Sequence, residues 1–152
     1  MIDSQNVKYF QVTPPAAILD NASATTNEID TKGWDYLTVI CSVGATDIAM
    51  AALKLQESDT SGSGFGDVTG AIFGTSTNTG GSASTLPSAT DDNKLFVFYV
   101  DLKNRKRYID LVATAGDGAA GTYFSAEAIL SRGEESPSSA SERGASQELR
   151  VG

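Results

Sequence analysis

Short segments in which apolar and polar residues alternate are the dominant pattern along this chain. Between residues 36 and 43, Leu37, Val39, Cys41 and Val43 all fall on one face. A strand turns successive side chains to opposite faces, so this period of two predicts a half-buried strand. The same reasoning predicts strands at 48–56, 94–102, 107–114 and 123–130, with shorter ones at 9–12, 16–19 and 27–29.

Two of these segments deviate from simple alternation. Residues 48–56 are rich in alanine: a strand would place Ala49, Ala51, Leu53 and Leu55 on one face, and a helix over the same residues is the alternative. Residues 94–102 are apolar on both faces, with many β-branched and aromatic side chains. That composition favours a strand covered on both sides.

Turn-forming residues separate the predicted strands. Residues 44–47 and 102–106 are short enough to close hairpins, and 116–118 begins a glycine-rich turn. The connector 58–92 is much longer and is rich in Ser, Thr and Gly. A structureless loop of that length is unusual in a compact domain. Its apolar island at 68–73 is expected either to form a short strand or to dock on a neighbouring chain.

These elements predict an all-β fold in one domain. Several short strands without a repeat of fixed period indicate an antiparallel β-sandwich, jelly-roll-like, interrupted by the long Ser/Thr/Gly-rich connector. The chain has 152 residues, which suits a single domain. We expect the sandwich to occupy 1–130 and an extended polar C-terminal tail to occupy 131–152, because the composition becomes rich in Ser, Glu and Gly after residue 130.

The charge of the chain argues against two classes of partner. The formal net charge is −8 and the pI is about 4.4, so phosphate backbones and anionic lipid surfaces are repelled. We therefore expect no nucleic-acid and no membrane partner. The start of the chain lacks the pattern of a signal peptide, and no apolar run approaches the length of a membrane helix, which predicts synthesis and use without export by the usual route.

Most catalytic chemistry lacks its residues in this sequence. The chain has no histidine and a single cysteine, Cys41, so a Ser-His-Asp triad and the usual zinc sites are ruled out. Cys41 sits in an apolar run and is expected to be a small buried side chain. We predict that the protein is not an enzyme and binds no cofactor or metal.

Two weaker ligand hypotheses remain on the acidic residues. A carboxylate pair could be drawn from Asp47, residues 91–92, Asp110 and Glu127, but such residues also occupy solvated turns or pair with cations across strands. The stretches 57–59 and 91–93 are rich in oxygen atoms and would suit calcium, although neither has EF-hand spacing.

The candidate partner contacts are apolar or basic residues outside the expected core. Trp34 precedes a strand and is expected either to plug the end of a sheet or to anchor a sugar or protein partner. The basic run 105–107 is expected either to form a solvated turn or to contact an acidic neighbour in an oligomer. The full set is Trp34, Phe65, Ile72, Phe73, Arg105, Lys106, Arg107, Leu149 and Val151.

Four segments in order resemble a known family. They are residues 29–39 (Ile-Asp-Thr-Lys-Gly-Trp-Asp-Tyr-Leu-Thr-Val), residues 52–59, residues 64–70 (Gly-Phe-Gly-Asp-Val-Thr-Gly) and residues 107–114. Together they resemble the small head-associated β-sandwich proteins that decorate, or cement, the capsids of tailed bacteriophages. The resemblance spans roughly residues 16–130 and leaves the tail uncovered.

This resemblance implies a structural role without catalytic residues. It predicts a virion protein made in the host cytoplasm and placed on the outer capsid surface, often as a homotrimer. There it would bridge subunits of the major capsid protein. The alternatives are another virion component, such as a head-fibre base or a tail part, and a carbohydrate- or calcium-binding β-sandwich module.

Overall fold

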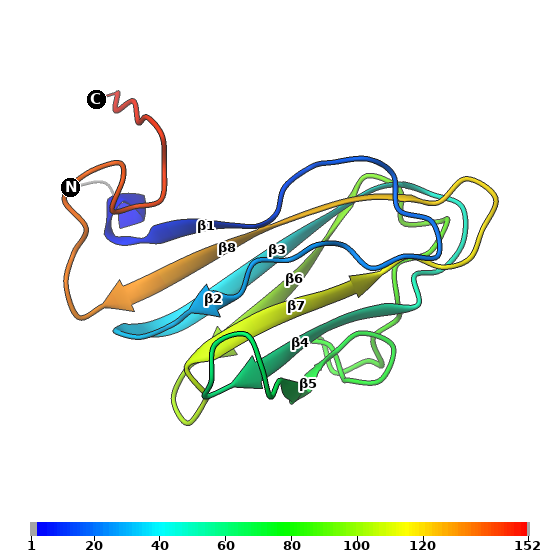
Figure 1. The fold of residues 1–152 in the computed structure, drawn as a ribbon, viewed down its shortest axis with the longest axis horizontal. Coiled ribbons are helices and arrows are strands. Elements are labelled where there is room, and N and C mark those ends of the chain that lie inside the picture. Colours follow the sequence, from blue (N-terminus) through cyan, green and yellow to red (C-terminus); the bar gives the residue numbers. More distant parts are fainter. Residues whose placement is uncertain (1–2, 152) are drawn as a thin grey trace.

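The computed structural model describes residues 3–151 as two four-stranded antiparallel sheets packed face to face (Figure 1). This confirms the predicted β-sandwich. A 3-10 helix, η1, precedes the strands, and the elements in chain order are η1 (Asp3–Asn6), β1 (Lys8–Thr13), β2 (Ile29–Asp30), β3 (Trp34–Thr46), β4 (Ala52–Ser58), β5 (Gly66–Ile72), β6 (Lys94–Asp101), β7 (Tyr108–Thr114) and β8 (Thr122–Gly133).

The chain crosses repeatedly between the two sheets. The first sheet has the order β1-β8-β3-β6 and the second has the order β2-β7-β4-β5. Consecutive strands therefore lie in different sheets, except that β4 and β5 are neighbours. The loop joining β4 to β5 is tied to the segment before β2, because the Glu28 carboxylate accepts hydrogen bonds from the Gly62 amide (2.9 Å) and the Ser61 hydroxyl.

The core lies between the sheets, where the period of two predicted it. Along β3, Leu37, Val39, Cys41 and Val43 are buried, as expected from the sequence. The opposite sheet faces them with a second set of buried apolar side chains, which includes Leu53, Leu55, Ile109, Leu111 and Ala113. The alternating face predicted for β8 is buried as well, at Phe124, Ala126, Ala128 and Leu130.

The predicted hairpins at 44–47 and 102–106 are wrong. The first turn leaves β3 in the first sheet and enters the second sheet, and the other leads from β6 in the first sheet to β7 in the second. Turn residues indicate that the chain reverses, but they do not indicate whether the next strand pairs with the last one or packs across the core from it.

Two predicted strands are also corrected. The strand of segment 48–56 begins only at Ala52, with Met50 buried and Ala49 and Ala51 exposed, and the helical alternative is excluded. Met50 is buried in the core, and its amide donates to the Pro87 carbonyl rather than to a neighbouring strand. Residues 16–19 form only an isolated bridge between Leu19 and Thr122.

Part of the long connector is ordered as a strand. The apolar island at 68–73 belongs to β5, with Val68 buried in the core, which confirms the first of its two predicted roles. The aromatic ring of Phe73 then packs edge-on against Phe96 and Phe98, at centroid distances of 5.3 and 4.9 Å. This cluster joins the end of β5 to β6 across the open side of the sandwich.

The core arrangement predicts a large stability loss on truncation of Leu111. Because Leu111 is 1% exposed and faces β3, we expect Leu111→Ala to reduce the free energy of unfolding by about 2–5 kcal/mol. Urea unfolding followed by circular dichroism measures this loss. Leu95→Ala is the matched control, because Leu95 is 63% exposed and its truncation should change stability by less than about 0.5 kcal/mol. Equal losses in the two variants would contradict the assigned core.

Candidate interaction surface

The outer face of the first sheet carries mostly uncharged side chains. Only Glu127 is charged among its outward-facing residues in the strand interiors. These are Tyr9 and Gln11 on β1, Tyr123, Ser125, Glu127, Ile129 and Ser131 on β8, Tyr36, Thr38, Ile40 and Ser42 on β3, and Leu95, Val97 and Tyr99 on β6. Direct cross-strand neighbours such as Ile40 and Val97 make the apolar part of this face continuous.

The edge of this face at β6 is the most exposed apolar region. Tyr99 is 72% exposed and Leu95 is 63% exposed. The prediction that both faces of this strand are covered is therefore wrong, because β6 is an edge strand whose second face meets solvent. The sequence run alone did not show that no further strand follows it in the sheet.

The two edges of the first sheet differ in whether another segment of the chain covers them. Along β1, the Tyr9 amide donates to the Arg143 carbonyl and the Val12 carbonyl accepts from the Asn27 amide, so other segments cover this edge. Within residues 3–151, β6 pairs only with β3. An uncovered edge strand offers backbone donors and acceptors to another chain, and natural proteins usually protect such edges.

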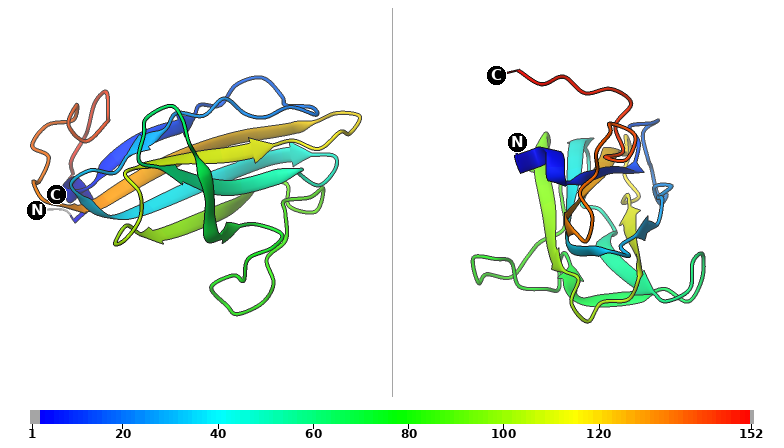
Figure 2. Two further views of the ribbon diagram at one scale, coloured as in Figure 1. Left: turned by 60° about the horizontal axis from the view of Figure 1, so that its bottom comes forward. Right: turned by 90° about the vertical axis from the view of Figure 1, so that its left-hand side faces the viewer.

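A groove of about 310 Å³ runs beside the β6 edge. We call it the edge groove. Leu95, Val97 and Tyr99 form one side, and Ile72 and Phe73 form the other, together with the loop that follows β5. Figure 2 shows this loop standing away from the sandwich on the side of β5 and β6. Apolar and aromatic side chains thus line a site that also has an unpaired strand at its rim.

Three polar side chains of the edge groove form hydrogen bonds within the loop itself. The Ser76 hydroxyl accepts from the Ile72 amide, and the Ser84 hydroxyl accepts from the Gly74 amide while it donates to the Ser76 carbonyl. The Asn78 side-chain oxygen accepts from the amides of Gly80 and Ser82. Because these groups hold the loop in shape, the groove offers a ligand mainly apolar side chains and strand backbone.

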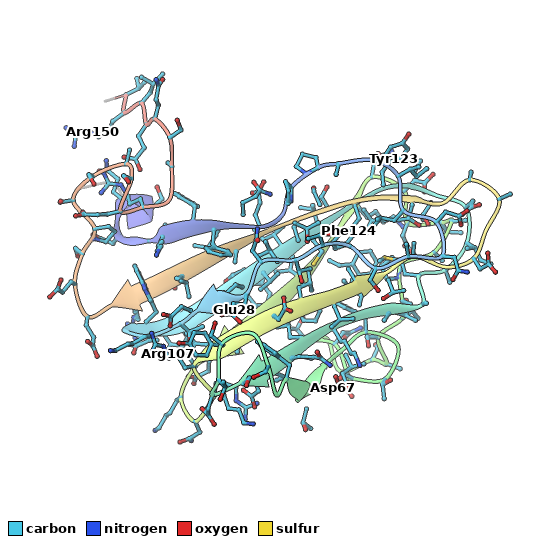
Figure 3. All side chains as sticks on the ribbon, viewed as in Figure 1. Glu28, Asp67, Arg107, Tyr123, Phe124 and Arg150 are labelled. Atoms are coloured by element: carbon cyan, nitrogen blue, oxygen red, sulfur yellow. The ribbon has the colours of Figure 1, made fainter. Side chains whose placement is uncertain are left out.

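The outer face of the second sheet differs because its charges pair within the chain. Lys54 Nζ lies 2.8 Å from Asp67, and Arg107 binds Asp30 with two hydrogen bonds of 2.7 and 2.8 Å. The pairing with Arg107 lowers the pKa of the Asp30 carboxyl, and the hydrogen bond from Lys54 lowers that of Asp67. Figure 3 shows Arg107 and Asp67 on this side of the sandwich.

The tail folds back on the first residues of the chain and is not simply extended. Arg143 is 8% exposed, and its guanidinium binds the Glu148 carboxylate at 2.7 and 2.8 Å and the Pro137 carbonyl at 2.6 Å. The Arg143 carbonyl accepts the Tyr9 amide of β1 at 2.7 Å. The tail is therefore anchored next to β1 as far as Glu148. Figure 1 shows both chain ends at this end of the sandwich.

The nine predicted contact residues lie in several places. Ile72 and Phe73 line the edge groove, whereas Leu149 and Val151 lie beyond the tail anchor with 98% and 92% of their surfaces exposed. Phe65 is half-buried just before β5. Of the nine, the structure thus brings only Ile72 and Phe73 into the edge groove.

The remaining predicted residues are largely engaged within the chain. Trp34 is half-buried, and a Cβ at Gly133 would lie 2.9 Å from its ring, which favours the sheet-end plug over a sugar platform. Arg105 pairs with Glu57 at 3.5 Å, and Arg107 with Asp30. Lys106 is exposed, with its amide bonded to Glu57.

The sequence did not predict Leu95, Val97 and Tyr99 as surface residues or Arg143 as the tail anchor. The two-faced apolar pattern of 94–102 was the available signal for the first three, since a strand of that kind is either covered by its own chain or open to another. Arg143 had no signal beyond being a long cation in a polar tail.

Several of the acidic candidates are held by ordinary structural contacts. Asp91 binds Lys94 and Ser88, and Glu57 pairs with Arg105. Backbone amides, that of Ala120 foremost, lower the pKa of Asp47. Among residues 3–151, no three acidic or cysteine side chains converge as a metal site would need. Burial raises the pKa of Cys41 to about 12, so its thiol stays protonated near neutral pH.

Comparison with known proteins gives no matching family model, no matching curated protein and no matching solved structure. No helix in the described part of the chain combines the length and apolar character needed to cross a bilayer. The fold and surfaces define a β-sandwich with one face self-paired by charges and the other face open. The function has to be argued from that contrast.

The tail anchor should depend on pH through Glu148. The Arg143 guanidinium lowers the pKa of Glu148 in the folded protein. The anchor is therefore complete above the unfolded pKa of roughly 4.3, and it is lost as the pH falls through the lower folded pKa. We expect the Tyr9 amide resonance, followed by NMR from pH 7 to pH 2, to shift with a midpoint below the ordinary pKa of a glutamate carboxyl.

A matched pair of variants checks that assignment. Glu148→Gln should weaken the anchor already at pH 7, whereas Glu135→Gln, in the same tail but without a side-chain hydrogen bond in residues 3–151, should titrate like the parent. A Tyr9 transition that persists in Glu148→Gln would show that another group controls the tail.

Proposed function

We propose that this chain is a structural protein of a tailed-phage virion, which decorates the capsid and stabilises it by bridging subunits of the major capsid protein. The observation that carries the proposal is the uncovered outer face of the first sheet with its open β6 edge. This face carries few charges, among them Glu127 and the Arg132 guanidinium that lies over the Tyr36 ring, and residues 3–151 do not cover it. Such a face indicates an interface with another protein. Four segments resemble those of cement proteins in the same order along the chain, which suggests that this interface is with the major capsid protein.

The strand pairing supports a jelly roll as the finer description of the sandwich. The first strand pairs with the last, and the pairs β2–β7, β3–β6 and β4–β5 follow inward. This is the pattern of one long hairpin rolled up on itself, and double-sheet jelly rolls of eight strands are common among virion proteins. The same topology also occurs in lectin domains, so it does not distinguish the two classes by itself.

The physical demands of a cement protein agree with the features described. Such a protein needs a stiff body and broad contacts rather than one deep site, because contacts repeated over a lattice add up to high avidity. The net charge of −8 keeps the free protein soluble and would steer it toward a basic partner surface. A homotrimer would close its self-contacts around a threefold axis.

The carbohydrate-binding alternative has less support. Trp34, its expected platform, packs on Gly133, and the Ser76 and Ser84 hydroxyls and the Asn78 side-chain oxygen of the edge groove are bonded within their own loop. A head-fibre base or tail part would need the same kind of open face. The location of the chain in the particle separates that alternative from capsid decoration.

Purified virions from cells that carry this gene test the proposal. Mass spectrometry should find the chain at a copy number comparable with that of the capsid lattice, and cryo-electron microscopy should place it on the outer shell. Absence from the particle, or density only in the tail, would refute the capsid role.

A pair of surface variants tests which face binds. Tyr36→Glu introduces a charge at a 40%-exposed position of the outer face of the first sheet, and it should reduce capsid occupancy at least tenfold. Thr69→Glu, exposed on β5 of the second sheet, should leave occupancy unchanged. Equal occupancy of the two variants would contradict the proposed face.

A further inference from the structure

We propose that residues 149–151, here called the terminal arm, bind in the edge groove of a second copy of this chain and add a short strand to its β6 edge. This inference rests on the proposed function only in expecting self-assembly, because each of its observations concerns this chain alone. It names the segment and the surface through which two copies join.

The receiving surface is suited to an extended segment with alternating side chains. The edge groove combines an open strand with apolar side chains, and the Ser76 and Ser84 hydroxyls and the Asn78 side-chain oxygen are bonded within the loop after β5. Backbone pairing with an edge strand supplies affinity, and pockets for every second side chain supply selectivity. The two charged residues of β6, Lys94 and Asp101, lie at its ends. Residues 95–100 therefore carry no charge that would repel an added strand.

The terminal arm has the complementary pattern. Leu149 and Val151 are separated by one residue, so an extended backbone directs both to the same side and Arg150 to the other. Both apolar side chains are more than nine-tenths exposed. Figure 3 shows Arg150 at the outer end of the tail, away from both sheets. Large apolar side chains left uncovered directly beyond an ordered anchor indicate that something else covers them.

The position of the anchor assigns the arm to a second copy. The tail lies outside β1, whereas the edge groove lies outside β6 at the opposite edge of the four-stranded sheet. The position of the tail and the position of the edge groove are therefore five strand-to-strand spacings apart, which amounts to about 24 Å. Residues 149–151 reach at most about 11 Å beyond Glu148 when fully extended. The arm therefore cannot reach its own edge groove while the Arg143–Glu148 pair holds.

The arm and the groove are different surfaces of the chain, and this determines the symmetry of the contact. An arm that binds a groove elsewhere on the next copy makes a head-to-tail interface, which forms a ring if the rotation closes and a filament if it does not. A ring of three copies agrees with the homotrimer proposed above. Each arm buries little surface, but a subunit of the ring leaves only when both of its contacts open, its own arm and the arm bound in its groove.

Light scattering coupled to size-exclusion chromatography of the full-length protein tests the proposal. We expect the parent chain to form a closed oligomer, and Leu149→Asp/Val151→Asp to shift it to monomers. Tyr99→Lys, in the groove, should do the same, whereas Ile48→Lys, at a 44%-exposed position outside the groove, should leave the oligomer intact. Circular dichroism should show unchanged folding in all three, since the mutated side chains are exposed.

A binding measurement with a labelled peptide of residues 145–152 identifies the occupant directly. Fluorescence anisotropy should show binding to the monomeric Leu149→Asp/Val151→Asp protein and at least tenfold weaker binding to the same protein that also carries Tyr99→Lys. A peptide with Asp at both apolar positions should bind neither protein.

Three outcomes would overturn the inference. One is a parent chain that stays monomeric at high concentration, and another is an oligomer that persists without Leu149 and Val151. The third is an oligomer that is lost only in Tyr99→Lys, which would indicate direct pairing of two β6 edges. Capsid occupancy of the monomeric variant is read separately: if it still decorates capsids, the virion role stands and only the arm exchange fails.

Discussion

Burial of the two inner sheet faces against each other is the constraint from which the rest of this structure follows. Because almost every connection crosses from one sheet to the other, each strand is fixed both by its paired neighbours and by the strands across the core. Leu37 and Val39 on β3, for example, have buried counterparts at Leu55 and Leu111. A one-residue slip of any strand would turn its buried set outward, so the core determines which side chains form the outer faces.

The two outer faces then differ in how their remaining side chains are satisfied. On the second sheet, cations and carboxylates pair within the chain, so that face has little need of a partner. On the first sheet, exposed tyrosine, leucine and isoleucine side chains meet water, and the β6 edge leaves strand backbone unpaired. Covering the first face releases water from apolar surface without breaking an ion pair. The same contact on the second face would have to desolvate several charges. This difference is the physical reason for assigning the interface to the first sheet.

The sequence was sufficient for the local features and insufficient for the long-range ones. Period-two alternation predicted β3, β7 and β8 with their buried faces, because side-chain direction along a strand is a local property. Which strands share a sheet depends on pairing between distant segments, so the turns at 44–47 and 102–106 were wrongly taken for hairpins. The apolar character of β6 was visible, but its exposure depends on its place at the edge of the sheet. Arg143 became an anchor only through its distance from Glu148 and the first strand, which no local pattern records.

The anchor of the polar tail affects how the end of the tail could bind a neighbour. A disordered arm that binds a neighbour loses conformational entropy when it becomes ordered, which weakens binding. Here the Arg143–Glu148 pair and the bond from Tyr9 already fix the chain up to residue 148, so only a few residues remain to be ordered on binding. A short arm that starts from a fixed point also limits which grooves it can reach, and its own groove is out of range. In the proposed exchange the anchor lowers the entropic cost of binding and directs the arm toward another copy, so that the tail would determine how the sandwich assembles.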